Sequence, residues 1–200
     1  MKINLKFLKR LPADEWRMTV PNLLTILRLL SVPVTVMMMV QHHWGMAFGS
    51  FLFAVVTDIC DGFLARYLNQ KTFLGACLDP IADKLLILSV YFTLAFVQSP
   101  LFSIPLWFVI LVLLKELVLI GGAMLLFYQK GFLKVEPTWL GKATMAVQSL
   151  FIIWLFACYF FHWLPVKTYY TALGVVLILV LSSLFQYVKI GLKQAYAYLS

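Results

Sequence analysis

Six apolar stretches, each near the length of a bilayer core, limit what this chain can fold into. They cover residues 21–40, 45–61, 79–97, 104–127, 138–161 and 168–188. A membrane-crossing helix needs roughly 20 apolar residues. Hydrophobic residues make up 63% of the chain and charged residues only 12%, whereas about a quarter of a soluble domain is charged. The sequence therefore predicts one all-α, polytopic integral membrane domain over residues 1–200, with six transmembrane helices.

The basic residues indicate how this domain sits in the bilayer. Residues 2–17 mix apolar side chains with five cations, which predicts an N-terminal interfacial amphipathic helix; a disordered basic tail is the alternative. Of the 16 Lys and Arg residues, only Lys167 falls in a loop on the side opposite the termini. The positive-inside rule therefore predicts cytoplasmic termini. The net charge of +8 indicates anionic lipid headgroups as partners and no nucleic acid.

The histidines and cysteines are expected to be structural. The histidines fall in predicted loops opposite the termini, as interfacial residues would, and they are His42, His43 and His162. The cysteines lack CxxC spacing, which argues against a zinc site or a disulfide framework. We expect them to be small buried side chains, and they are Cys60, Cys77 and Cys158.

Polar residues follow one face of the first predicted span. Asn22, Thr25 and Arg28 are three residues apart, so they share one side of a helix. A polar stripe within a membrane helix lines a cavity or contacts another helix.

The densest group of charges lies between the second and third spans. Half of the eight acidic residues fall within residues 58–83, and they are Asp58, Asp61, Asp79 and Asp83. Spacings of three and four residues put each pair on one helix face, so two helices can present four carboxylates across a gap. Such a group needs cations, and oxygen ligands suit Mg²⁺ or Mn²⁺. Two such ions can stabilise a pyrophosphate leaving group.

Small and basic residues accompany these acids. Gly62 and Gly75 leave room for a ligand or another helix. Arg66 can offer its guanidinium group to phosphate oxygens.

Two other interpretations of the acids remain open. One is a salt-bridged membrane core in which the acids are balanced by Arg66, Lys84, Lys115 and Lys142; two evenly spaced acid pairs with glycines between them argue against it. The other is an ion-coupled transporter. Coupling sites lie near the bilayer midplane, whereas these acids are predicted at the cytoplasmic ends of their helices.

The acidic stretch resembles a known family signature. Read as D-x-x-D-G-x-x-A-R-x8-G-x3-D-x3-D, it is similar to the motif of the CDP-alcohol phosphotransferase family. The matched positions are Asp58, Asp61, Gly62, Ala65, Arg66, Gly75, Asp79 and Asp83. The segments PNLLTILRLLSVPV and LGKATMAVQ are similar to parts of the family's bacterial phosphatidylglycerophosphate synthases, so the resemblance extends over most of the chain.

The resemblance implies a role for each matched residue. Asp58, Asp61 and Asp79 would hold one Mg²⁺ or Mn²⁺ ion, and Asp83 would help to hold a second. Asp83 would also deprotonate the acceptor hydroxyl, whose oxygen attacks the β-phosphorus of CDP-diacylglycerol and releases CMP. The residues implied to contact CDP-diacylglycerol are Asn22, Thr25, Gly62, Arg66 and Thr72. The resemblance also implies a homodimer, and the bacterial inner membrane is the expected location. The positive-inside rule predicts that the acidic stretch, and with it the active site, is cytoplasmic.

The acceptor alcohol is less clearly indicated. Glycerol 3-phosphate is the first candidate for the acceptor, and Lys115 and Lys142 are expected to bind its phosphate. Alternatively, Lys115 pairs with Glu116 and Lys142 is an interfacial residue. The usual synthase pattern has a second arginine near Gly122 and a second lysine at Thr144, and this chain has neither. Cardiolipin synthases of the same family are similar to this chain in the same region. Their acceptor, phosphatidylglycerol, is therefore the alternative.

Overall fold

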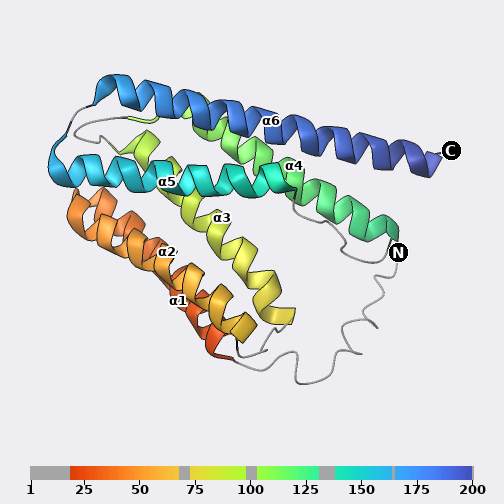
Figure 1. Cartoon of the computed structure of the whole chain (residues 1–200), viewed down its shortest axis with the longest axis horizontal. Coiled ribbons are helices and arrows are strands. Elements are labelled where there is room, and N and C mark those ends of the chain that lie inside the picture. Colours follow the sequence, from red (N-terminus) through yellow and green to blue (C-terminus); the bar gives the residue numbers. More distant parts are fainter. Residues whose placement is uncertain (1–18, 68–72, 98–102, 131–137, 164, 200) are drawn as a thin grey trace.

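The computed structural model describes residues 19–67, 73–97, 103–130, 138–163 and 165–199, and within these ranges the regular structure is entirely helical (Figure 1). The helices are α1 Val20–Val40, α2 Trp44–Tyr67, α3 Phe73–Phe96, α4 Leu106–Lys130, α5 Trp139–Phe161 and α6 Val166–Leu199. The all-α prediction is confirmed for this part of the chain. The expected interfacial helix at residues 2–17 lies outside the described residues.

The six predicted spans coincide with the six helices in order, but several helix ends differ. Helix α2 continues to Tyr67 instead of ending near residue 61, and α3 begins at Phe73 instead of near residue 79. Helix α6 runs to Leu199, well past residue 188. The predicted ends followed the loss of apolar character. A helical backbone satisfies its own hydrogen bonds and does not have to stop where charged side chains begin.

The helices pack so that α2 and α3 occupy the middle of the molecule. Helix α1 packs against α2 and α3, α2 and α3 both contact α5, and α4 contacts α3 and α6. Helices α5 and α6 run side by side along the long axis (Figure 1). The acid-bearing helices α2 and α3 are therefore bordered by α1 on one side and by α5 on the other.

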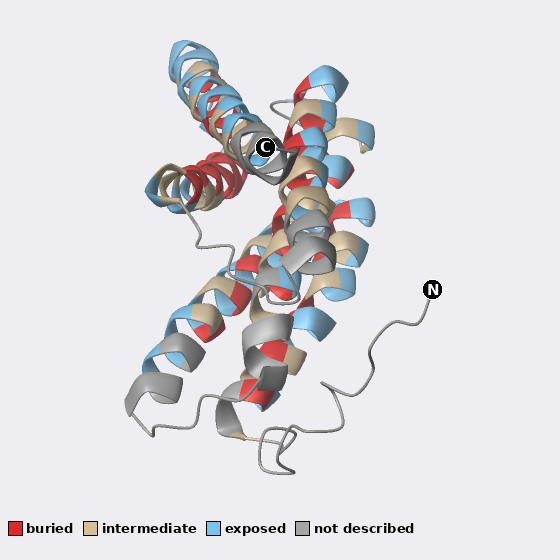
Figure 2. Cartoon of the chain, turned by 90° about the vertical axis from the view of Figure 1, so that its right-hand side faces the viewer, coloured by how far each residue is buried: buried red, intermediate tan, exposed pale blue. Residues whose placement is uncertain are grey.

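A core of apolar side chains fills the space between these helices. It includes Phe51 on α2, Tyr91 on α3, Phe108 on α4, Leu155 on α5 and Val180 on α6. The buried positions lie on the inward faces of the helices (Figure 2).

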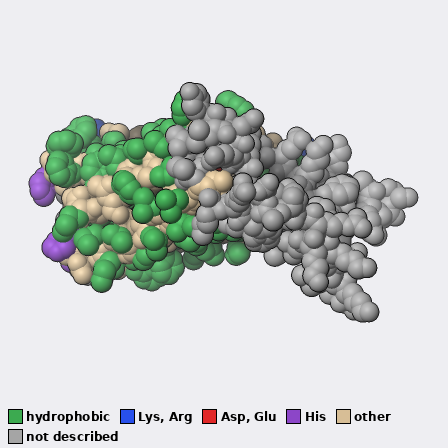
Figure 3. Space-filling view, turned by 90° about the horizontal axis from the view of Figure 1, so that it is seen from below, with side chains coloured by type: hydrophobic (Ala, Val, Ile, Leu, Met, Phe, Trp, Pro, Cys, Tyr) green, Lys and Arg blue, Asp and Glu red, His purple; other side chains and the backbone are tan. Residues whose placement is uncertain are grey.

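The outward faces are apolar as well. Large exposed apolar side chains occur on every helix, for example Leu23, Phe53, Phe92, Trp107, Leu150 and Phe185. The described surface is largely hydrophobic in the space-filling view (Figure 3). Continuous exposed apolar surface of this extent is typical of a membrane-facing or partner-facing protein.

Within the described residues, three helices are long and apolar enough to cross a membrane. Their apolar segments are Asn22–Val40, Trp139–Phe161 and Val166–Gly191, and α2 adds a shorter one, Trp44–Cys60. In α3 the described residues include Asp79, Asp83 and Lys84, which shortens its apolar part. Six membrane crossings therefore stay a prediction.

The histidines lie together at one end of the molecule, at the exposed turns after α1 and α5 (Figure 3). This position agrees with the expectation of surface residues. The expectation for the cysteines is wrong for Cys60, which is exposed on α2, and correct for Cys158, which is buried. The side chain of Cys77 lies outside the described part.

Candidate active site

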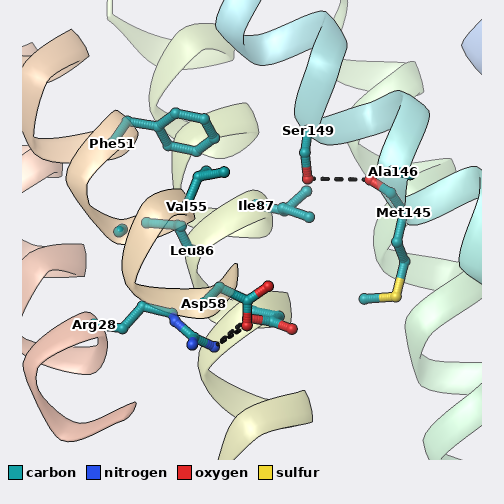
Figure 4. Close-up of a pocket in the computed structure, with 11 residues that line it drawn as sticks. Arg28, Phe51, Val55, Asp58, Leu86, Ile87, Met145, Ala146 and Ser149 are labelled. Atoms are coloured by element: carbon teal, nitrogen blue, oxygen red, sulfur yellow. Dashed lines mark hydrogen bonds and ion pairs between the residues drawn. The ribbon is translucent and has the colours of Figure 1, made fainter. Parts of the chain in front are cut away.

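Arg28 on α1 joins carboxylates from two other helices. Its Nη1 atom lies 2.7 Å from Oδ1 of Asp58 on α2 and 2.6 Å from Oδ1 of Asp83 on α3 (Figure 4). The Arg28 side chain is fully buried, whereas Asp58 and Asp83 are 43% and 33% exposed. One buried cation thus holds two partly exposed acids that are 25 residues apart in the chain.

The polar stripe of α1 explains how Arg28 reaches this place. Asn22, Thr25 and Arg28 are buried, whereas Leu23 and Leu27 on the other side of the helix are exposed. The stripe was expected to line a cavity or to contact a partner helix, and both hold: Arg28 lines a cavity and also contacts α2 and α3.

A second contact lies one turn away on the same stripe. The hydroxyl of Thr25 donates a hydrogen bond of 2.6 Å to Oδ1 of Asp79. Thr25 and Arg28 are three residues apart, and their partners Asp79 and Asp83 are four apart. Both spacings are close to one helical turn. The two helices therefore meet in register, and α1 positions both acids of α3.

A cavity of about 240 Å³ opens beside these carboxylates. Its polar end is formed by Arg28, Asp58 and Asp83. The remaining lining residues come from α2, α3 and α5, and they are Phe51, Ala54, Val55, Leu86, Ile87, Met145, Ala146 and Ser149 (Figure 4). A ligand here would meet charge at one end and apolar side chains along the rest.

The α5 side of the cavity carries one hydroxyl group. Ser149 donates a hydrogen bond of 3.1 Å to the backbone oxygen of Met145, one helical turn earlier (Figure 4). Since this bond is made within its own helix, Ser149 contributes little fixed polarity to the cavity. The charged groups of the cavity thus come from α1, α2 and α3.

The donor chemistry fits a hard divalent cation. Asp58 and Asp83 offer carboxylate oxygens to the same positive nitrogen, and carboxylate oxygens are the ligands that Mg²⁺ and Mn²⁺ prefer. Among the described side chains, no three His, Cys, Asp or Glu residues are grouped closely enough to hold one ion. The side chain of Asp61, the fourth predicted ligand, lies outside the described part.

Several predicted nucleotide contacts also lie outside the described part of the chain. The helix α2 contains Gly62 and Arg66, but their side-chain surroundings are not among the described features, and Thr72 lies outside the described residues. Asn22 and Thr25 are buried on α1 beside the acids. Their contact with CDP-diacylglycerol stays a prediction.

Lys115 takes part in a separate buried network. Its Nζ atom lies 2.8 Å from Oε1 of Glu116 and donates a hydrogen bond of 3.2 Å to Oε1 of Gln148 on α5. Lys84 on α3 lies 2.8 Å from the other carboxylate oxygen, Oε2, of Glu116. The alternative in which Lys115 pairs with Glu116 is thus confirmed, and this network links α3, α4 and α5.

The network also bears on two predictions about the lysines, a salt-bridged core with the aspartates and the binding of an acceptor phosphate. Lys84 and Lys115 pair with Glu116, and among the described side chains neither lysine forms an ion pair with Asp58, Asp79 or Asp83, as the salt-bridged core would need. Lys142 is exposed on α5. Neither Lys115 nor Lys142 lines the cavity, and their role in binding an acceptor phosphate stays a prediction.

Sequence reasoning missed the central position of Arg28. Its place on the polar stripe was recognised, but nothing in the sequence specified which acids it contacts. A signal was available, because an arginine inside an apolar segment needs a buried anion. The α5 wall of the cavity had an indirect signal, since Met145 and Ala146 lie in the family-like segment LGKATMAVQ, but nothing in the sequence placed that segment beside the acids.

Comparison with known proteins agrees with this geometry. A family model described as CDP-alcohol phosphatidyltransferase matches residues 18–188. The cardiolipin synthase (CMP-forming) of Rattus norvegicus is 33% identical over 150 residues, which cover 67% of this chain and 48% of that protein. The CDP-diacylglycerol–glycerol-3-phosphate 3-phosphatidyltransferase of Aquifex aeolicus is 34% identical over 136 residues, covering 68% of this chain and 74% of that protein.

A third relative is the Cereibacter sphaeroides protein with the same name as the Aquifex aeolicus protein. It is 35% identical over 143 residues, which cover 68% of this chain and 63% of that protein. The chain spans about half of the length of the first curated relatives that it matches. Relatives of both names therefore resemble the chain to a similar degree.

Proposed function

The chain belongs to the CDP-alcohol phosphatidyltransferase family, and from this membership we propose that it transfers the phosphatidyl group of CDP-diacylglycerol to glycerol 3-phosphate. The products would be phosphatidylglycerophosphate and CMP. With its apolar helices and its family, the chain is an integral membrane protein. Both substrates are thus expected at the membrane surface, where the lipid donor keeps its acyl chains in the bilayer.

One observation supports this proposal more than any other. Asp58, Asp79 and Asp83, all predicted from the family signature, are each held by a side chain of α1, namely Arg28 or Thr25. Two of the three border a cavity with an apolar wall. A charged end beside an apolar wall suits a substrate that combines a diphosphate with a lipid.

We propose that Mg²⁺ or Mn²⁺ ions are held by Asp58, Asp61, Asp79 and Asp83. When bound, two such ions supply positive charge that stabilises the diphosphate and the leaving CMP. Hydrogen bonds and ion pairs from α1 hold three of these carboxylates in place before substrate arrives.

Asp83 is the proposed general base. It borders the cavity and is partly exposed, so an acceptor hydroxyl can reach its carboxylate. The hydroxyl proton passes to Asp83 as the acceptor oxygen bonds to the β-phosphorus of the donor. The bond between that phosphorus and the bridging oxygen breaks, and CMP leaves with the bonding electrons.

The remaining proposed contacts surround this centre. Asn22, Thr25, Gly62, Arg66 and Thr72 are proposed to bind CDP-diacylglycerol, as the family motif implies. The proposed orientation places the active site and both termini in the cytoplasm, and a homodimer is the proposed assembly.

A second acceptor, phosphatidylglycerol, is favoured by one specific observation. Lys115 is buried and already bound to Glu116 and Gln148, so it is poorly placed to neutralise the doubly charged phosphate of glycerol 3-phosphate. Phosphatidylglycerol carries a single negative charge and needs fewer cations. The relative from Rattus norvegicus carries the name cardiolipin synthase, in agreement with this second candidate.

An acceptor panel tests the proposal. The full-length protein in detergent is supplied with CDP-diacylglycerol and Mn²⁺ or Mg²⁺, together with glycerol 3-phosphate, phosphatidylglycerol, serine or inositol, and released CMP is measured. We expect CMP with glycerol 3-phosphate and none when metal is chelated. CMP release with phosphatidylglycerol alone would establish the second candidate. Ion flux in liposomes without CDP-diacylglycerol, and no CMP with any acceptor, would favour a transporter.

A further inference from the structure

We propose that Arg28 is a built-in counter-ion, which holds Asp58 and Asp83 together when no metal ion is bound and competes with a metal ion for the same oxygens. The first part rests on the structure alone. The second part rests on the metal binding proposed above. Arg28 lies outside the acidic signature, within the family-like segment PNLLTILRLLSVPV, and its contacts follow from where the fold places it.

The burial of Arg28 supports the first part. Its side chain has no exposed surface, and it lies on a helix whose neighbouring residues Leu27 and Leu29 are exposed and apolar. A guanidinium group in such surroundings is very unfavourable unless anions neutralise it. Asp58 and Asp83 provide two anions, so the three charges depend on one another.

The geometry supports the second part. A single nitrogen of Arg28 contacts one oxygen from each carboxylate, at 2.7 Å and 2.6 Å. The nitrogen therefore occupies the space between these two oxygens, where an ion bridging the same two oxygens would also lie. When both carboxylates are ionised, they and Arg28 together carry a net charge of −1. Without Arg28 the charge would be −2, which attracts a divalent cation more strongly.

Substitution of Arg28 should consequently act in opposite directions on stability and on metal affinity. In Arg28→Gln the two carboxylates repel each other when no metal is present, so helices α1, α2 and α3 pack less well. A divalent cation removes this repulsion. Hence the variant should depend on metal for its stability, while binding that metal more tightly than the wild type.

The test uses full-length protein in detergent. Thermal unfolding is followed by tryptophan fluorescence in EDTA and in Mn²⁺, and free Mn²⁺ is titrated by electron paramagnetic resonance. The variants are Arg28→Gln and Arg28→Lys. The control is Thr35→Val, because Thr35 is buried on the same helix but bonds to Ser31 and Ser50 instead of an acid.

We expect Arg28→Gln to unfold at a lower temperature than the wild type in EDTA, with most of the difference removed by Mn²⁺, and to bind Mn²⁺ about tenfold more tightly. Arg28→Lys keeps the positive charge on a shorter side chain. Its unfolding temperature and its Mn²⁺ affinity should lie between those of the wild type and Arg28→Gln. Thr35→Val should lose equal stability in EDTA and in Mn²⁺, as a packing residue would.

Two results would overturn the proposal. If Arg28→Gln is as stable as the wild type in EDTA, Arg28 is not the counter-ion. Where Arg28→Gln does not fold, the same comparison is made with Arg28→Lys. If Mn²⁺ binds the variant no more tightly than the wild type, there is no competition. Failure of the wild type itself to bind Mn²⁺ contradicts the proposed metal site and the competition, whereas the unfolding in EDTA still decides the counter-ion role.

Discussion

Thr25 on α1 donates a hydrogen bond of 2.6 Å to Asp79 on α3. One turn later on α1, Arg28 binds Asp83. The first helix therefore does more than anchor the protein in the membrane. It fixes the rotation of α3 about its axis, and with it the direction in which two of the site's carboxylates point.

Removal of the Thr25 hydroxyl should lower activity more than stability. A hydrogen bond to a charged group contributes about 1.5–3 kcal/mol, which corresponds to a loss of roughly 10-fold to 100-fold in CMP release if Asp79 is misplaced. Thr25→Val keeps the shape of the side chain, and Thr25→Ser keeps the hydroxyl as the matched control. If Thr25→Val released CMP at the wild-type rate, Asp79 would not need this contact.

Neutralisation of Asp83 should stop the reaction without abolishing metal binding. Asp83→Asn can no longer accept the proton of the acceptor hydroxyl, and general-base catalysis contributes about 10²–10⁴-fold. Asp58 keeps its ion pair with Arg28, so the fold should remain. Ser149→Ala is the control, because Ser149 lines the same cavity and bonds only to its own helix. Single-turnover CMP release and Mn²⁺ binding are the measurements; activity retained in Asp83→Asn would remove it from the role of base.

Loss of the carboxylate of Glu116 should destabilise the protein strongly. Glu116 neutralises both Lys84 and Lys115, and breaking a buried ion pair by removing one partner costs about 3–5 kcal/mol. Glu116→Gln should therefore lower the free energy of unfolding by that amount, while Lys142→Met, at an exposed position, should change it little.

Lys115 also allows a kinetic test of the predicted acceptor site. Since Lys115 is bound within the network, Lys115→Met should affect stability more than the KM for glycerol 3-phosphate. A large rise in that KM, with unchanged unfolding, would restore Lys115 to the acceptor site. Steady-state kinetics and thermal unfolding of the same preparations distinguish the two outcomes.

Gly141 is required by a close approach of α5 and α6. A Cβ atom at this position would collide with the hydroxyl of Tyr187, so Gly141→Ala should cost about 1–3 kcal/mol. Tyr187→Phe removes the hydroxyl and should recover part of this loss in the double variant. Gly174→Ala on α6 is the control, because nothing lies within 4 Å of the added atom; it should be neutral or stabilising by up to about 1 kcal/mol. Thermal unfolding of the four variants tests each step.

The helices of this protein were predictable because each apolar segment carries its own evidence of length and composition. The ends of α2 and α3 were not, since the acids that interrupt the apolar pattern lie inside these helices. The polar stripe of α1 was recognised from spacing, yet spacing alone could not distinguish a cavity from a helix contact. The pair of Lys115 and Glu116 was expected only as an alternative to acceptor binding, and the contact of Lys84 with Glu116 was not predicted.

By itself the sequence determined the helical membrane class, the four acids and their family motif. These features depend on local properties: apolar length, charge and the number of residues between two side chains. The tertiary structure decided that Arg28 pairs with Asp58 and Asp83, and that Lys84 pairs with Glu116. Which charge meets which depends on the packing of α1 against α2 and α3, and of α4 against α3. Such partners lie tens of residues apart, so only the fold brings them within ion-pair distance.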